Sequence, residues 1–115
     1  MRLRPPLIAM LLLVLQGSAV AYDDEREWSS ERGTFKVSFE VDDPIEINKI
    51  HSWVLFIQTM SGDPVTTAEI SVDGGMPLHD HGMPTRPRVT ENLGNGRYRL
   101  EGLRFHMSGQ WEVSV

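Results

Sequence analysis

The residues most able to do chemistry lie in one ten-residue segment, Met76 to Thr85 (MPLHDHGMPT). The segment contains two of the four histidines and two of the six methionines in the chain. Imidazole binds Cu(I), Cu(II) and Zn(II), whereas the thioether of methionine is a soft ligand that favours Cu(I). In an extended segment His79 and His81 point to the same side, because side chains alternate along the backbone. This pattern predicts a metal site that prefers copper.

The predicted metal ligands fall into two groups along the chain. The segment itself supplies Met76, His79, His81 and Met83, and the later part of the chain adds His106 and Met107. His106 can join the site only if the end of its strand lies under the segment. Met107 also fits the hydrophobic core, because it continues the apolar face of its strand. Asp80 lies between the two histidines and could add an oxygen ligand or orient an imidazole.

Plainer explanations of these residues remain open. A His-x-His pair in a solvated loop often binds nothing. Met76 and Met83 could instead close one end of the core, where flexible thioethers fill irregular gaps. His51, at the start of a strand pattern, is expected to lie on the surface or to be hydrogen-bonded within the fold.

The composition excludes several classes of function. The chain has 115 residues, no cysteine and a formal charge of −5. The lack of cysteine rules out disulfides, thiolate metal sites and cysteine nucleophiles. The negative charge argues against nucleic acid as a partner. No catalytic triad spacing, phosphate-binding glycine loop or carboxylate pair in an apolar context is present, so we expect a protein that is not an enzyme.

Residues 1–21 resemble a secretory signal peptide. Arg2 and Arg4 precede the apolar run Leu7 to Leu15, and Ala19-Val20-Ala21 is a small-x-small cleavage site. The apolar run is shorter than the roughly 20 residues that span a bilayer, so we expect no membrane span after cleavage. An uncleaved N-terminal anchor is the alternative. Cleavage after Ala21 changes the formal charge from −5 to −7.

The remaining chain divides into a polar leader and one β-domain. Residues 22–33 are polar and charged and are expected to form a flexible leader or a loosely docked arm. Residues 34–115 alternate between apolar and polar, with turn signals every eight to twelve residues. The predicted strands are 34–41, 51–59, 68–72, 88–91, 97–100, 103–107 and 111–115, with a loop from Asp73 to about Pro87. We expect 51–59 to be a central strand covered on both faces.

These strands predict an all-β fold, a small antiparallel immunoglobulin-like β-sandwich preceded by a signal peptide. The alternation places ten residues in the core: Phe35, Val37, Phe39, Trp53, Leu55, Ile57, Tyr98, Leu100, Phe105 and Trp111.

Three motifs give the sequence a family resemblance. They are Gly75-Met76-Pro77 followed by His81-Gly82-Met83-Pro84, then Gly96-x-Tyr98, then Leu103-x-Phe105-x-Met107-x-Gly109-x-Trp111. With these motifs the chain resembles the YtkA-like family. This family is related to the FixH-like proteins and is found among bacterial exported and membrane-anchored proteins. The resemblance covers residues 35–115. Unlike the FixH-type members, this chain shows no transmembrane segment, which puts direct coupling to a membrane pump in doubt.

The resemblance implies an immunoglobulin-like fold and a role in copper handling and cytochrome oxidase assembly. It places the metal at Met76, His79, His81 and Met83, with Met107 nearby. We therefore expect a non-catalytic periplasmic protein that sequesters a copper ion or delivers it to an envelope protein. A metal-free interaction module of the envelope is the alternative. A copper enzyme is disfavoured, because no substrate cleft is evident in the sequence.

Overall fold

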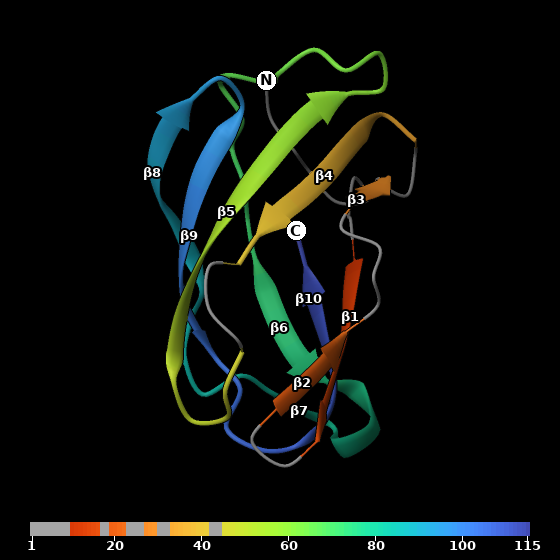
Figure 1. Ribbon diagram of the computed structural model, residues 1–115, viewed down its shortest axis with the longest axis vertical. Helices are drawn as coiled ribbons and strands as arrows, with labels where there is room; N and C mark the ends of the chain where they lie inside the picture. The colour runs from red at the N-terminus through yellow and green to blue at the C-terminus, as the bar shows by residue number, and fades with distance from the viewer. Residues whose placement is uncertain (1–9, 17–18, 23–26, 30–32, 42–44) are drawn as a thin grey trace.

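The computed structural model describes residues 10–16, 19–22, 27–29, 33–41 and 45–115, and its regular elements are almost all strands (Figure 1). The strands are β1 (Met10–Gln16), β2 (Ala19–Tyr22), β3 (Glu27–Ser29), β4 (Phe35–Glu40), β5 (Ile50–Thr59), β6 (Asp73–Met76), β7 (His81–Gly82), β8 (Arg88–Gly94), β9 (Arg97–Arg104) and β10 (Gly109–Ser114). A single 3-10 turn, η1 (Pro77–His79), lies between β6 and β7.

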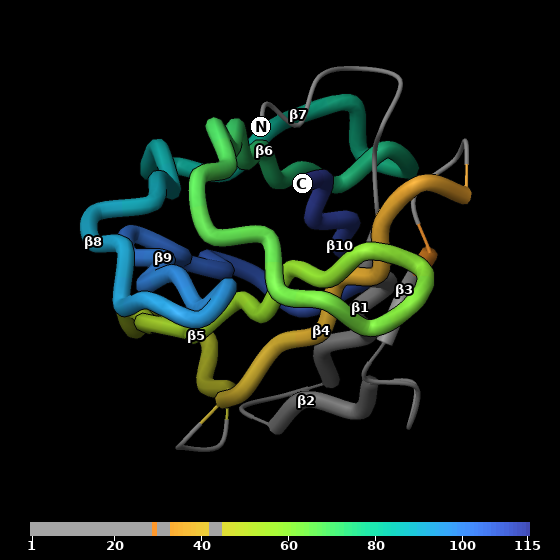
Figure 2. The backbone as a smooth tube through the Cα atoms, turned by 90° about the horizontal axis from the view of Figure 1, so that it is seen from above, coloured from red at the N-terminus to blue at the C-terminus, as the bar shows by residue number. Residues whose placement is uncertain are grey.

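The strands form two antiparallel sheets. One has the order β2-β1-β10-β6-β7 and the other has the order β3-β4-β5-β9-β8. Seen from above, β6 and β7 lie on one side of the molecule, and β4 and β5 lie on the other (Figure 2). The predicted antiparallel β-sandwich is therefore confirmed.

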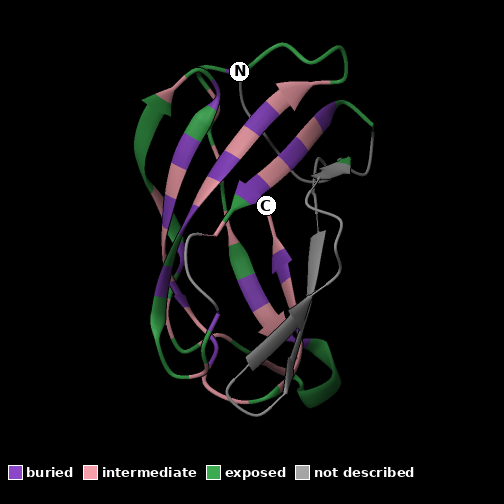
Figure 3. Ribbon diagram, in the orientation of Figure 1, coloured by how far each residue is buried: buried purple, intermediate pink, exposed green. Residues whose placement is uncertain are grey.

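The core lies between the sheets, where buried residues alternate with less buried ones along β4, β5, β9 and β10 (Figure 3). All ten predicted core residues are buried, with at most 6% of their surface exposed. The structure adds Ile45, Val65, Met76, Leu103 and Val113 to the core. Burying an apolar side chain contributes about 1.5–3 kcal/mol, so the alternating pattern sets which face of each strand turns inward.

One predicted strand and part of one predicted loop are wrong. Residues 68–72 do not form a regular strand, although Ala68, Ile70 and Val72 pack against the core. The structure instead has a strand, β6, within the predicted loop, and this strand pairs with β10. A Cβ at Gly74 would lie 2.7 Å from Met83 Cε. Gly74 thus lies close against the end of the Met83 side chain, whereas the sequence prediction took this glycine as a loop signal.

β5 is central, as predicted, but it is not covered on both faces. β4 and β9 pair with its two edges. On its outer face Val54 and Phe56 are only half-buried. The ion pair between Arg97 on β9 and Glu40 on β4 joins the two strands that pair with β5. Long charged side chains can cover apolar surface in this way, so β5 needs no further layer on that side.

The N-terminal predictions fall partly outside the described residues. Within the predicted signal peptide, β1 pairs with β10 and β2 pairs with β1. A structure of the full chain does not test cleavage, so the signal peptide stays a prediction. Within the predicted leader, β3 pairs with β4, which fits the docked-arm alternative. Residues 1–9, 17–18, 23–26 and 30–32 lie outside the described part of the chain.

Tyr98 holds the long connection between β5 and β6. Its hydroxyl donates a hydrogen bond of 2.6 Å to the Val65 carbonyl and accepts one of 3.0 Å from the Ala68 amide. Tyr98 is 2% exposed, so both bonds lie inside the molecule. A tyrosine on β9 thereby fixes a segment of the chain that has little strand pairing of its own.

Candidate functional site

The histidine segment is a tight reversal of the chain and not an extended strand. The turn η1 ends at Asp80, which has a left-handed backbone (φ 52°), and β7 then returns beside β6. The rings of His79 and His81 have centroids 6.0 Å apart and an interplanar angle of 26°. The predicted closeness of the two imidazoles is therefore present, but a turn produces it and not side-chain alternation.

His106 joins the two histidines of the segment. Its ring centroid is 5.2 Å from that of His81. The chain just after β9 therefore lies beside the histidine segment, as His106 requires if it is to join the predicted site. Trp111 on β10 contacts both rings edge to face, at 6.0 Å from His81 and 5.4 Å from His106. The indole is fully buried and forms a rigid wall behind the two imidazoles.

Met76 and His79 meet at Gly109, the first residue of β10. A Cβ built on Gly109 would lie 2.4 Å from Met76 Cε and 3.7 Å from His79 Nε2. Gly109 also has a positive φ of 134°, which side chains other than hydrogen rarely allow. Met76 is fully buried, so it also closes the end of the core, as the plainer explanation expected. Gly109 is therefore the position that lets the loop and β10 approach each other.

The other two predicted methionine ligands are engaged elsewhere. Met83 Sδ accepts a hydrogen bond from the Arg104 amide at 3.4 Å, and the Met83 methyl lies against Gly74. The Met107 side chain packs against the core, and its carbonyl accepts a hydrogen bond from Trp111 Nε1 at 3.0 Å. The structure thus gathers Met76, His79, His81 and His106, and it gives Met83 and Met107 packing roles.

Hydrogen bonds set which imidazole nitrogens are free. His81 Nδ1 donates to the Gly82 carbonyl at 3.0 Å, so the neutral ring carries its lone pair on Nε2. A backbone carbonyl therefore orients this imidazole, which is the role that the sequence analysis considered for Asp80. His106 Nδ1 is buried and has no hydrogen-bond partner among the described residues.

The pKa of His106 is lowered below its ordinary value of 6.5. Burial is the main cause, because it disfavours the charged ring, and the positive charges of His81 and Arg104 act in the same direction. A lowered pKa keeps the imidazole neutral at neutral pH. A neutral ring is the form that binds metal ions.

The donor set differs from that of a hard, nitrogen-and-oxygen metal site. Within the described residues, no group of three histidine, aspartate or glutamate side chains converges on a point suited to a metal ion. What the segment offers is a set of imidazoles beside one thioether. Such a mixed set suits a soft ion with few ligands better than Zn²⁺, which favours four nitrogen, oxygen or thiolate ligands.

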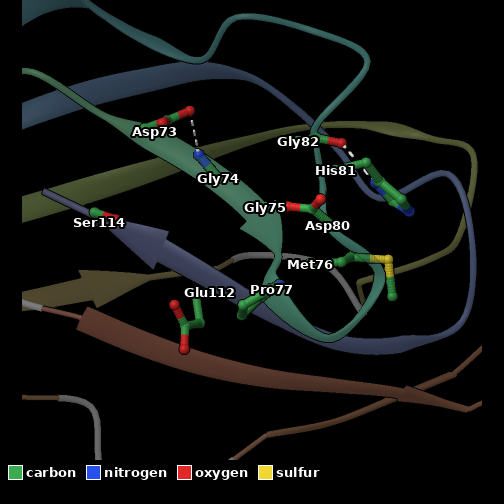
Figure 4. A pocket seen from close by; sticks show the side chains of 10 residues that line it. All are labelled: Asp73, Gly74, Gly75, Met76, Pro77, Asp80, His81, Gly82, Glu112 and Ser114. Atoms are coloured by element: carbon green, nitrogen blue, oxygen red, sulfur yellow. Dashed lines mark hydrogen bonds between the residues drawn. The ribbon is translucent and has the colours of Figure 1, made fainter.

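A groove of about 420 Å³ opens beside these residues (Figure 4). Met76 and His81 line it, and so do the carboxylates of Asp73, Asp80 and Glu112. Among the residues that the structure describes, no lysine or arginine lines this groove. The site therefore borders a surface of negative charge, which attracts cations and basic partners.

Gly109, Trp111 and the Gly82 carbonyl are the parts of the site that sequence reasoning missed. Gly109 and Trp111 do belong to the quoted motif Met107-x-Gly109-x-Trp111. A glycine placed two residues before a buried tryptophan was the available signal for a close approach of the backbone.

One comparison with known proteins identifies the family of this chain. A model of the family described as YtkA-like matches residues 30–115. The chain belongs to the YtkA-like family. The matched region includes the histidine segment, His106 and both β10 residues of the site. YtkA-like domains are small all-β domains and not a known enzyme family. Searches of curated proteins and of solved structures find no match.

The predicted absence of a membrane span is only partly examined by the structure. In the described ranges between residues 10 and 115, no helix is long and apolar enough to cross a membrane.

Proposed function

We propose that this YtkA-like chain works in the bacterial periplasm, where it binds one copper ion and passes it to an envelope protein without catalysis. The observation that carries the proposal is the position of His81, whose ring centroid lies 6.0 Å from that of His79 and 5.2 Å from that of His106, and which is the strand partner of Met76. Two of the three buried side-chain atoms that lack a hydrogen-bond partner in the described structure, Arg104 Nε and His106 Nδ1, lie next to this cluster. Buried polar groups are normally paired, so an unpaired imidazole nitrogen supports a ligand role.

The chemistry of the cluster favours Cu(I). Imidazole nitrogens bind both copper oxidation states, and the Met76 thioether adds a donor that stabilises the softer ion. The lone pair on His81 Nε2 and the neutral state of His106 leave two nitrogens ready to bind. Met83 is left out of this set, because its sulfur accepts the Arg104 amide and its methyl lies against Gly74.

The position of the ligands suits transfer of the ion. His79 lies in an exposed turn, next to Leu78, which is 75% exposed. An acceptor protein can therefore reach this imidazole and replace it by one of its own ligands. Met76 and His106, by contrast, lie deeper and would hold the ion until the exchange.

Titration of the processed chain with Cu(I), against a coloured chelator of known affinity, tests the proposal. The double variant His79→Ala/His81→Ala should lower the Cu(I) affinity by roughly tenfold or more, because tenfold corresponds to only about 1.4 kcal/mol. Met76→Leu should weaken Cu(I) and leave Cu(II) almost unchanged. Met83→Leu is the matched control, since it makes the same chemical change outside the cluster. Equal effects of the two leucine variants would contradict the assignment of Met76.

A metal-free interaction module is the second candidate, and the groove supports it. Three carboxylates line the groove, and the exposed Leu78 lies beside it on η1. An exposed apolar residue beside a charged groove is typical of a surface that docks a partner. If the unaltered chain binds neither copper ion in the titration, the metal proposal is overturned and this candidate stands.

A further inference from the structure

The outer edge of β10 is covered by a segment that the chain is predicted to lose. β1 pairs with β10 over six consecutive positions, from Met10 opposite Ser114 to Leu15 opposite Gly109. Both β1 and most of β2 belong to the predicted signal peptide, residues 1–21. Cleavage after Ala21 removes β1, and the backbone N–H and C=O groups on that edge of β10 then have no strand beside them.

This edge differs from the other long edge of the molecule. β8 pairs with β9 through two register shifts, between Val89 and Glu91 and between Asn92 and Gly94. Such bulges twist an edge strand and protect it from pairing with another chain. β10 pairs with β1 and with β6 without any register shift. Its edge is therefore straight and able to receive a strand.

We infer that in the processed chain the β10 edge pairs antiparallel with β10 of a second copy, which gives a two-fold symmetric dimer. β1 shows that an antiparallel strand fits this edge. A two-fold axis satisfies the free backbone groups of both copies at once, because the same surface serves on each side. The two sheets would then join into one continuous sheet through the paired β10 strands.

The sequence of β10 selects one register for this pairing. Residues directly opposite each other lie on the same face of the sheet. The buried Trp111 and Val113 must therefore lie opposite residues of the second copy that also point inward. A register centred on Glu112 would place two carboxylates opposite each other. A register centred on Trp111 places Gln110 opposite Glu112 of the second copy, twice by symmetry, and no like charges meet. Registers centred on Gln110 or Val113 would pair only three residues of β10 in each copy, against five for Trp111, so we assign the register centred on Trp111.

The experiment uses the exported, processed chain, with its N-terminus checked by mass spectrometry and its mass in solution measured by sedimentation equilibrium. The unaltered chain should show a monomer–dimer equilibrium. Gln110→Glu places two pairs of carboxylates across the interface and should weaken the dimer by roughly tenfold. Gln110→Lys places two ion pairs there and should strengthen it several-fold. Both variants change a half-buried residue of similar size, so their monomer stabilities should stay alike.

Three results would overturn the inference. The first is a processed chain that stays monomeric at millimolar concentration. The second is a dimer whose affinity the Gln110→Glu and Gln110→Lys variants change in the same direction. The third is a purified chain that retains residues 1–21, in which β1 still pairs with β10. None of these results depends on whether the chain binds copper.

Discussion

His51 is a buried histidine and His106 is half-buried with a buried Nδ1, and the two rings are held differently. His51 is 6% exposed, and its Nε2 lies 2.9 Å from the Glu46 carbonyl and 3.2 Å from the Glu46 amide. It is thus tied to the backbone before β5. His106 has a buried Nδ1 with no partner among the described residues, and a second imidazole lies beside it. A histidine paired with the backbone serves the fold, whereas an unpaired one among other ligands is available for binding.

Replacement of Trp111 should have the largest effect on this comparison. Trp111→Ala removes the fully buried wall behind His81 and His106, and it leaves the Glu46 contacts of His51 in place. Loss of a buried aromatic side chain should lower the free energy of unfolding by about 3–5 kcal/mol. Chemical denaturation measures this change. A loss below about 1 kcal/mol would mean that the indole is not part of the core.

The two histidines should respond in opposite ways to alanine. His51→Ala leaves the Glu46 groups without their partner and should cost about 2 kcal/mol of stability, with no change in copper affinity. His106→Ala removes a ring whose nitrogen has no partner, so it should cost less than about 1 kcal/mol and weaken copper binding. Denaturation and copper titration of both variants check this. Matching profiles would remove the distinction between the two sites.

The smallest effect should be a dependence of stability on pH that arises at His106. Its pKa is lowered in the folded chain, mainly by burial, whereas in the unfolded chain it returns to about 6.5. Below pH 6.5 the unfolded chain therefore binds more protons at this ring, and the free energy of unfolding falls as the pH is lowered. Thermal melts from pH 7.5 to 5.5, recorded with a chelator present, should show this slope. His106→Gln should reduce it, and an unchanged slope would assign it to other groups.

The regular half of this fold was predictable because its signals are local. Alternation along β4, β5 and β9 depends only on neighbouring residues, and all ten predicted core residues are buried. The turn between β8 and β9 was equally readable, since Asn95 and Gly96 adopt the positive φ values that this dipeptide favours.

β6 was missed because its pairing with β10 depends on contacts between distant parts of the chain. Gly74 makes room for Met83, and Gly109 makes room for Met76. The Gly74 contact leaves no pattern in the local sequence, and the Gly109 contact leaves only the glycine two residues before Trp111. The same reason applies to the candidate ligands. Residue types predicted six of them, but only the fold shows that the Met83 sulfur accepts a hydrogen bond from the Arg104 amide.

The Tyr98 hydroxyl has a consequence for the order in which the chain folds. Its two hydrogen bonds join residues that are 33 and 30 positions apart in the sequence. Contacts between residues so far apart form late, because closing a long loop costs entropy before any bond is gained. The connection from residue 60 to 72 should thus stay open until β9 has docked against β5. A chain that ends before Tyr98 lacks both bonds, so this connection is then more open to proteases than in the folded protein.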